Sequence, residues 1–221
     1  MSIAVDLAPQ RSASAPFLGR TMVLAALVLA PALEVIESVI SPLVGTSTSA
    51  DLAAIGAHRD TFVTSVLVGL VATVLYVPAF LGLAAACVTR SPWLARIGGA
   101  LAVVSMLGFC GVRMLQAVQL QLVDNGGASE AGAALIDHTG TNPIGLALLI
   151  MFLGGTIVGT LALAVAAWRT GLAKPAVVLL IAFPFVDQAM PGHAGSIAAH
   201  VVILVALTGL AASMHRLQPR S

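Results

Sequence analysis

Six long apolar segments divide this chain and constrain most strongly what it can fold into. They span about 21–44, 61–88, 94–122, 143–168, 175–190 and 196–214. A helix needs about 20 apolar residues to cross the hydrocarbon core of a bilayer, and only the fifth segment is clearly shorter. Charged residues make up 9% of the chain, against about a quarter in a soluble domain. The sequence therefore predicts an all-α integral membrane protein, a bundle of six transmembrane helices in the cell membrane.

The basic residues predict how this bundle is oriented. With a cytoplasmic N-terminus, the inner side holds eight of the ten lysines and arginines, the outer loops hold Arg59, and Arg113 lies within the third segment. Positive charge favours the cytoplasmic side, so we expect both termini to be cytoplasmic. We expect a disordered cytoplasmic tail over residues 1–19, the transmembrane domain over 20–215 and a second cytoplasmic tail over 216–221. The outer loops, 41–60 and 123–142, are long enough to form lids or short interfacial helices.

Two carboxylates interrupt the first apolar segment. Glu34, Glu37, Ser38 and Ser41 recur at helical spacing and therefore share one face. A charged group within a bilayer is costly and usually faces a bundle interior or a wet cavity. At a rise of about 1.5 Å per residue, Arg113 lies about 25 Å along its own helix, which matches the depth of both carboxylates. We expect Arg113 to pair with Glu34 or Glu37, and the pair either belongs to a polar site or only fixes helix packing.

A third carboxylate, Asp187, ends the fifth segment. Pro184 is expected to kink the helix there, and Phe183 and Phe185 precede the carboxylate by four and two residues. A carboxyl group beside aromatic surface is partly desolvated, and such an environment suits a general acid. The alternative is an interfacial aspartate that caps the following helix.

A few further polar residues fall near the same level. Gln116 lies one turn beyond the arginine, and His200 lies in the last segment, although a histidine on an apolar helix is more often a packing residue. Asp60 either caps the second helix or closes the site from above. The histidines lack metal-ligand spacing, Cys87 and Cys110 form no CxxC pair, and the net charge is +1. We therefore expect no metal, no cofactor and no nucleic-acid partner.

A small six-span protein with Glu34 and Glu37 in one helix and Asp187 in another resembles the small bacterial integral-membrane terpene cyclases of drimentine-type pathways. It is more distantly similar to the membrane cyclases of fungal meroterpenoid pathways. The likeness covers size, number of spans and placement of the acids, and includes no long motif. It implies that membrane-embedded acids protonate a terminal alkene or epoxide of a prenylated substrate, whose cation then cyclises. The chain has no DxDD or DDxxD stretch, so the rules of soluble terpene synthases do not transfer.

Two functional hypotheses follow. The first is a membrane-embedded terpene cyclase that protonates the prenyl chain of a lipophilic, farnesylated substrate, which partitions into the bilayer and enters between helices. The second is a small ion-coupled transporter or ligand-binding membrane protein that uses the same buried charges. Aromatic faces stabilise cations, although aromatic residues are only 5% of the chain. Neither hypothesis fixes an oligomeric state. The expected catalytic residues are Asp187, Glu34, Glu37 and Arg113, and the expected substrate-binding residues are Phe183, Phe185, Phe109, Phe152, Phe62, Gln116, His200 and Asp60.

Overall fold

The structure is a computed structural model that describes residues 19–190 and 192–216, with the backbone alone at residues 187 and 188. Within this part of the chain all regular structure is helical, and no strand is present. Helices α1 to α8 are Arg20–Ile40, Thr48–Ala57, Arg59–Cys87, Pro92–Asp124, Glu130–Thr141, Pro143–Thr170, Lys174–Ala189 and His193–Arg216.

Five of these helices, α1, α3, α4, α6 and α8, are long and apolar enough to cross a membrane. The chain is therefore an all-helical protein of multi-pass membrane character, as predicted. Helix α7 has 16 residues, which at 1.5 Å per residue give about 24 Å, less than a hydrocarbon core of about 30 Å. Each of the six predicted segments corresponds to one helix within a few residues, but the sixth crossing depends on this short helix.

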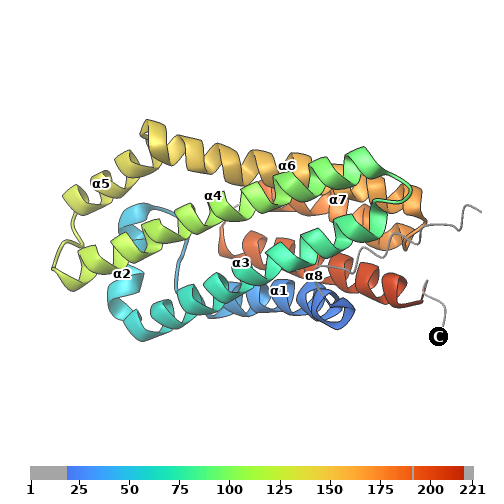
Figure 1. Ribbon diagram of the computed structural model, residues 1–221. Coiled ribbons are helices and arrows are strands. Elements are labelled where there is room, and N and C mark those ends of the chain that lie inside the picture. The colour runs from blue at the N-terminus through green and yellow to red at the C-terminus, as the bar shows by residue number, and fades with distance from the viewer. Residues whose placement is uncertain (1–18, 191, 217–221) are drawn as a thin grey trace, which may run out of the picture.

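The long helices run side by side, and the two short helices α2 and α5 lie at one end of the bundle (Figure 1). The start of α1 and the end of α8 meet at the opposite end, where the Arg20 guanidinium lies 3.1 Å from His215 Nδ1 and donates to the His215 carbonyl at 3.2 Å. The first and last helices therefore begin and end on the same side of the bundle. The predicted tails, apart from Gly19 and Arg216, lie outside the described residues.

The two long loops fold into the short helices that their length predicted. Ser47 caps α2 and Ser129 caps α5, each accepting a bond from a first-turn amide. Asp51 in α2 accepts from two amides of the preceding loop, and Thr48 donates to Asp137 and so joins α2 to α5. The loops thus form a structured cap over one end of the bundle.

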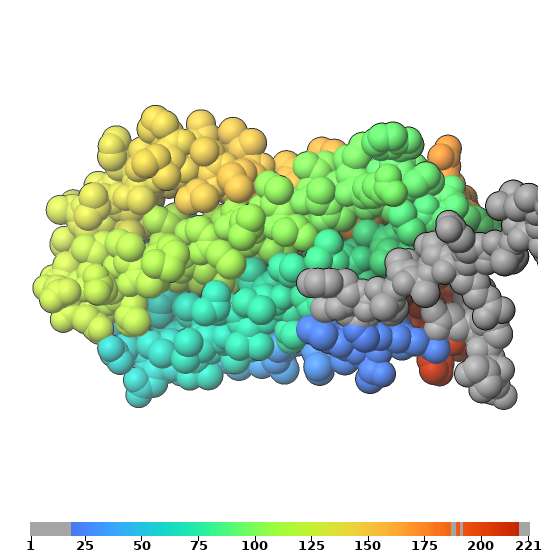
Figure 2. Space-filling model, in the orientation of Figure 1, coloured from blue at the N-terminus to red at the C-terminus, as the bar shows by residue number. Residues whose placement is uncertain are grey.

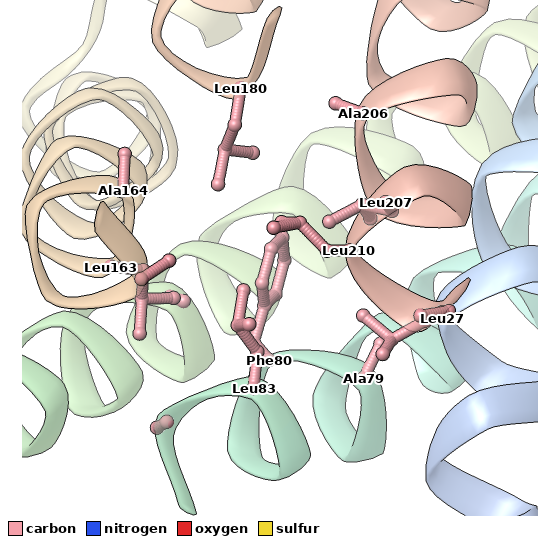
Figure 3. Packing of buried hydrophobic residues seen from close by; sticks show 14 of the residues in the cluster. Leu27, Ala79, Phe80, Leu83, Leu163, Ala164, Leu180, Ala206, Leu207 and Leu210 are labelled. Carbon is pink, nitrogen blue, oxygen red and sulfur yellow. The ribbon is translucent and has the colours of Figure 1, made fainter. Parts of the chain in front are cut away.

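Two apolar clusters hold the bundle together. The larger one fills the half of the bundle away from α2 and α5 with alanine and leucine side chains of α1, α3, α6, α7 and α8, such as Leu27, Leu83, Leu163, Leu180 and Leu207 (Figure 3). The smaller one lies beneath the cap and consists of Leu52, Ile55, Phe62 and Ala133. Along α1 and α3, the residues between these clusters are the polar ones described next.

Candidate functional site

A buried guanidinium joins three helices at the centre of the bundle. Arg113 in α4 donates from Nη2 to both carboxylate oxygens of Glu34, at 2.9 and 3.1 Å, and from Nη1 to Glu37 at 3.4 Å. Its side chain is 4% exposed, and those of Glu34 and Glu37 are 1% and 11% exposed. The pairing predicted from matching helix depths is therefore present. Removing either partner would leave a buried charge without compensation, which is costly.

Helix α3 supplies the space and the last acceptor for this arginine. A Cβ atom added at Gly69 would overlap the Arg113 guanidinium, so only glycine admits the side chain there. Thr73, one turn later, accepts from Arg113 Nε at 3.1 Å and donates to the Gly69 carbonyl at 2.8 Å. The Phe109 ring lies 4.4 Å from the guanidinium carbon, in the range of a cation–π contact. The arginine is thus held in one place from several directions.

His200 in α8 extends the cluster toward the cap. Its Nδ1 lies 2.7 Å from the Ser38 hydroxyl and 3.4 Å from the Ser196 hydroxyl, while its Nε2 lies 3.6 Å from a Glu34 oxygen. The imidazole therefore lies between two hydroxyls and the deeply buried carboxylate of Glu34. An imidazole in such a position can pass a proton between its two sides.

Two cavities meet at the cluster. An apolar cavity of about 50 Å³ is lined by five aromatic residues and, among the side chains that the structure describes, by one carboxylate, Glu34. A polar cavity of about 350 Å³ lies toward α2 and is lined by both glutamates, Arg113 and Asp51. The residues common to both linings are Glu34, Phe109, Phe152, Phe183 and His200. Glu34 therefore stands at the boundary between a polar and an aromatic space.

Aromatic residues are much more frequent in the lining of the apolar cavity than in the chain as a whole. The chain has ten aromatic residues, and five of them line the apolar cavity, namely Tyr76, Phe80, Phe109, Phe152 and Phe183. Phe109 and Phe152 stack with ring centroids 4.5 Å apart. Their helices approach closely at Gly108, where a Cβ would lie 2.6 Å from the Phe152 amide nitrogen. Low aromatic content overall thus coexists with one densely aromatic cavity.

The polar cavity contains an acceptor that the described residues leave unused. Gln116 lines this cavity, and its Oε1 is buried without a hydrogen-bond partner among them. A buried carbonyl oxygen that lacks a donor costs free energy. A hydroxyl or amine of a ligand in the polar cavity would satisfy it. Gln116 therefore lies beside Arg113 in the lining of the polar cavity, at the level that the sequence predicted.

The structure brings most of the predicted residues together and places three elsewhere. Phe62 is buried in the cluster beneath the cap because α2 folds back over it. Phe185 is 58% exposed on α7. The Asp60 side chain is fully exposed and lies 3.7 Å from Arg59 at the start of α3. These three residues line neither cavity. Asp187 lies near the end of α7, and its side chain is outside the described part of the chain.

Four residues of α3 that the sequence interpretation passed over belong to the site. Gly69, Thr73, Tyr76 and Phe80 recur at spacings of four, three and four, which places them on one helix face. That periodicity was the available signal. Because none of these four residues is charged, their spacing in an apolar helix cannot be distinguished from that of an ordinary packing face.

The described residues contain no group of three or more His, Cys, Asp or Glu side chains able to hold a metal ion. No protein-family model, no curated protein and no solved structure matches this chain. The geometry and chemistry of the two cavities are therefore the basis for inferring a function.

Proposed function

We propose that the protein is a membrane-embedded terpene cyclase that binds a lipophilic prenylated substrate and starts ring closure by protonating the chain, with Glu34 as the proton donor. The observation that carries this proposal is the position of Glu34, the one carboxylate among the described side chains of a cavity lined by half of the chain's aromatic residues. Aromatic faces stabilise carbocations, and a dry cavity protects them from quenching by water.

The charge balance of the cluster supports this role. Two carboxyl groups share one guanidinium, so full ionisation would leave a net negative charge in the bundle. Because an uncompensated charge there is costly, one proton shared among Glu34, Glu37 and His200 stabilises the cluster. Glu34 touches the aromatic cavity, whereas Glu37 touches only the polar one. The polar cavity is the route by which water replaces a spent proton.

The proposed reaction is an isomerisation. The proton adds to the terminal alkene of the prenyl chain and leaves a cation on the neighbouring carbon. The π electrons of an internal alkene then form the new ring bond, and a proton leaves the final cation to restore an alkene. The product has the mass of the substrate.

The topology we propose has six crossings with both termini in the cytoplasm, in the cell membrane. The meeting of the α1 start and the α8 end supports an even number of crossings. The distribution of lysine and arginine supports the cytoplasmic location of that end. The polar cavity then opens toward the outer face, beneath α2.

The direct test uses the purified full chain in lipid nanodiscs, supplied with farnesylated aromatic substrates and followed by mass spectrometry. We expect a new product of unchanged mass in water. In deuterium oxide we expect one deuterium at the carbon that was the terminal alkene. If none of the prenylated substrates is converted, the proposal is wrong.

Three amide variants identify the donor, because an amide keeps shape and hydrogen bonding but carries no transferable proton. Glu34→Gln should lower the rate by about 10²–10⁴, the usual contribution of a general acid, while thermal unfolding shows that the fold is retained. Glu37→Gln, the matched control, should have a smaller effect. Should Asp187→Asn stop the reaction and Glu34→Gln leave it intact, Asp187 is the donor.

Ion-coupled transport is the second candidate, and the contact chain from the polar cavity through Ser38 and His200 to Glu34 favours it. A transporter would move a labelled solute into proteoliposomes under a proton gradient and would leave the solute chemically unchanged. Uptake that collapses with the gradient, together with no product of ring closure, would select this function.

A further inference from the structure

A second apolar space lies outside the site, on the flank of the bundle. Helices α3 and α4 lie side by side on the face shown in Figure 2, and a groove of about 450 Å³ runs between them. Among the described residues its lining, to which α1 adds Met22, is almost entirely aliphatic, with Thr73 as the one polar side chain apart from the thiol of Cys110. On its rim Val74 and Leu107 are each 60% exposed. Within a bilayer, this groove faces the acyl chains.

Two residues connect the groove to the site. Met106 lines both the groove and the aromatic cavity, so its side chain is the partition between them. Thr73 lines the groove and also accepts the hydrogen bond from Arg113. Methionine is unbranched and flexible, so this partition can move without disturbing the helices. Pro78, also in the lining, cannot donate a backbone bond to the preceding turn, which loosens α3 beside the groove.

The volumes show why a second space is needed. A water molecule needs about 10–15 Å³ of such volume, so the aromatic cavity of about 50 Å³ holds only a few carbon-sized groups. A fifteen-carbon chain does not fit there alone. The polar cavity is larger, but its lining includes Glu37, Arg113 and Asp51, and a hydrocarbon chain there would displace the water that solvates these charged groups, which is costly. The groove is both large and apolar.

We infer that the α3–α4 groove is the binding site and lateral portal for the hydrocarbon chain of the substrate, which reaches Glu34 past Met106. This inference rests on the proposed function, which identifies the hydrocarbon as the prenyl chain of the substrate. Protons then arrive through the polar cavity and hydrocarbon through the groove, and the two paths meet at Glu34. The alkene never crosses the charged cluster.

The binding test uses a farnesol derivative that carries a diazirine at the end away from its hydroxyl. It is photolysed in phosphatidylcholine–phosphatidylglycerol nanodiscs that contain the full chain. We expect cross-links on groove residues such as Leu81, Leu107 and Cys110, and we expect excess farnesol to suppress them. Leu107→Trp fills the groove and should remove most of the cross-linking. Val158→Trp, at a similarly exposed position on α6, is the matched control and should not.

The role of Met106 as a partition is tested by changing the size of its side chain. Met106→Phe should slow the supply of chain to the aromatic cavity, and Met106→Ala should widen the passage and speed it. A third way to obstruct the groove is to alkylate Cys110 with a lipophilic maleimide, which modifies protein that has already folded. A Cys87→Ala background leaves Cys110 as the one thiol of the chain. Retained thermal unfolding profiles show that each block acts on the groove and not on the fold.

The outcomes separate this inference from the proposed function. Competed groove cross-links without any ring-closed product would uphold the groove as a prenyl-chain site and refute the cyclase. Ring closure at the wild-type rate in Leu107→Trp, Met106→Phe and the alkylated protein would refute the groove and leave the cyclase standing. Cross-links spread evenly over lipid-facing positions and unaffected by farnesol would show ordinary lipid contact, and the groove proposal would be wrong.

Discussion

Replacing Arg113 by methionine tests whether the buried cluster is an ion pair that the fold depends on. Methionine keeps much of the aliphatic stem of the arginine but removes every donor to Glu34, Glu37 and Thr73. The Glu34 and Glu37 side chains are 1% and 11% exposed, so water in the adjoining polar cavity reaches little of either carboxylate and is a poor replacement for the guanidinium. We expect Arg113→Met to cost about 3–5 kcal/mol in unfolding free energy, the usual loss when one partner of a buried pair is removed.

A neutral triple variant shows which part of that loss is electrostatic. Arg113→Met combined with Glu34→Gln and Glu37→Gln contains no charge in the cluster, and neutral replacements of whole buried ion pairs are often tolerated. We therefore expect the triple variant to regain most of the stability that the single variant loses. Arg59→Gln is the control, because Arg59 pairs with Asp124 at 2.7 Å on the exposed end of the bundle. Its loss should be much smaller, since exposed ion pairs contribute little.

The measurement is reversible unfolding in mixed micelles, followed by circular dichroism as sodium dodecyl sulfate is titrated. From most to least destabilised, we expect the order Arg113→Met, then the triple variant, then Arg59→Gln. Equal stability of Arg113→Met and Arg59→Gln would refute the buried pair. A triple variant as unstable as the single one would show that packing around the arginine stem, and not stranded charge, decides the outcome.

Two further predictions use matched variants, and a third concerns the orientation of the bundle. Gly69→Ala places a methyl group against the pinned guanidinium and should cost about 1–3 kcal/mol, whereas Gly154→Ala, with nothing within 4 Å, should be neutral or slightly stabilising; equal unfolding midpoints would contradict this. Phe183→Leu should release early-quenched or rearranged products in the cyclase assay, and Phe185→Leu, on the exposed face of α7, should leave the product profile unchanged. A reporter fused after Gly127 should read as extracytoplasmic, and a cytoplasmic signal would overturn the proposed orientation.

The central ion pair was predictable because it depends on one reliable quantity. The rise of an α-helix per residue is nearly constant, so Arg113 and the two glutamates could be set at one depth by counting from the ends of their segments. Burial cost then made their pairing the expected arrangement. The helix bounds were predictable for a similar reason, since apolar length and turn residues such as Pro92, Asn142 and Gly171 mark where the helices begin and end.

Helix orientation about its own axis was harder to predict, and the misplaced residues show why. Phe183 and Phe185 are two residues apart, which is about 200° around a helix, so one cavity could not receive both rings. Helical spacing alone could have separated them. Phe62 is different, because its burial depends on α2 folding back beneath the cap. No local pattern in α3 encodes that contact, which joins segments through a loop.

The two halves of the bundle differ in how tightly their side chains pack, and this difference helps to separate loss of activity from loss of folding. The half away from the cap is filled by alanines and leucines whose exposure is near zero, and such close packing supplies most of the stability of a helical bundle in lipid. The half nearer the cap contains the polar cavity and the cluster, where side chains meet across open space. Phe183 lines both cavities and is partly buried, with one side packed against the larger apolar cluster, so its substitution removes fewer packing contacts than that of a fully buried leucine. The exceptions are Arg113, which joins α1, α3 and α4 by its own bonds, and the cavity residues Tyr76, Phe80 and Met106, which belong to the larger apolar cluster. A cavity variant that loses turnover while keeping its unfolding midpoint has consequently lost chemistry and not its fold.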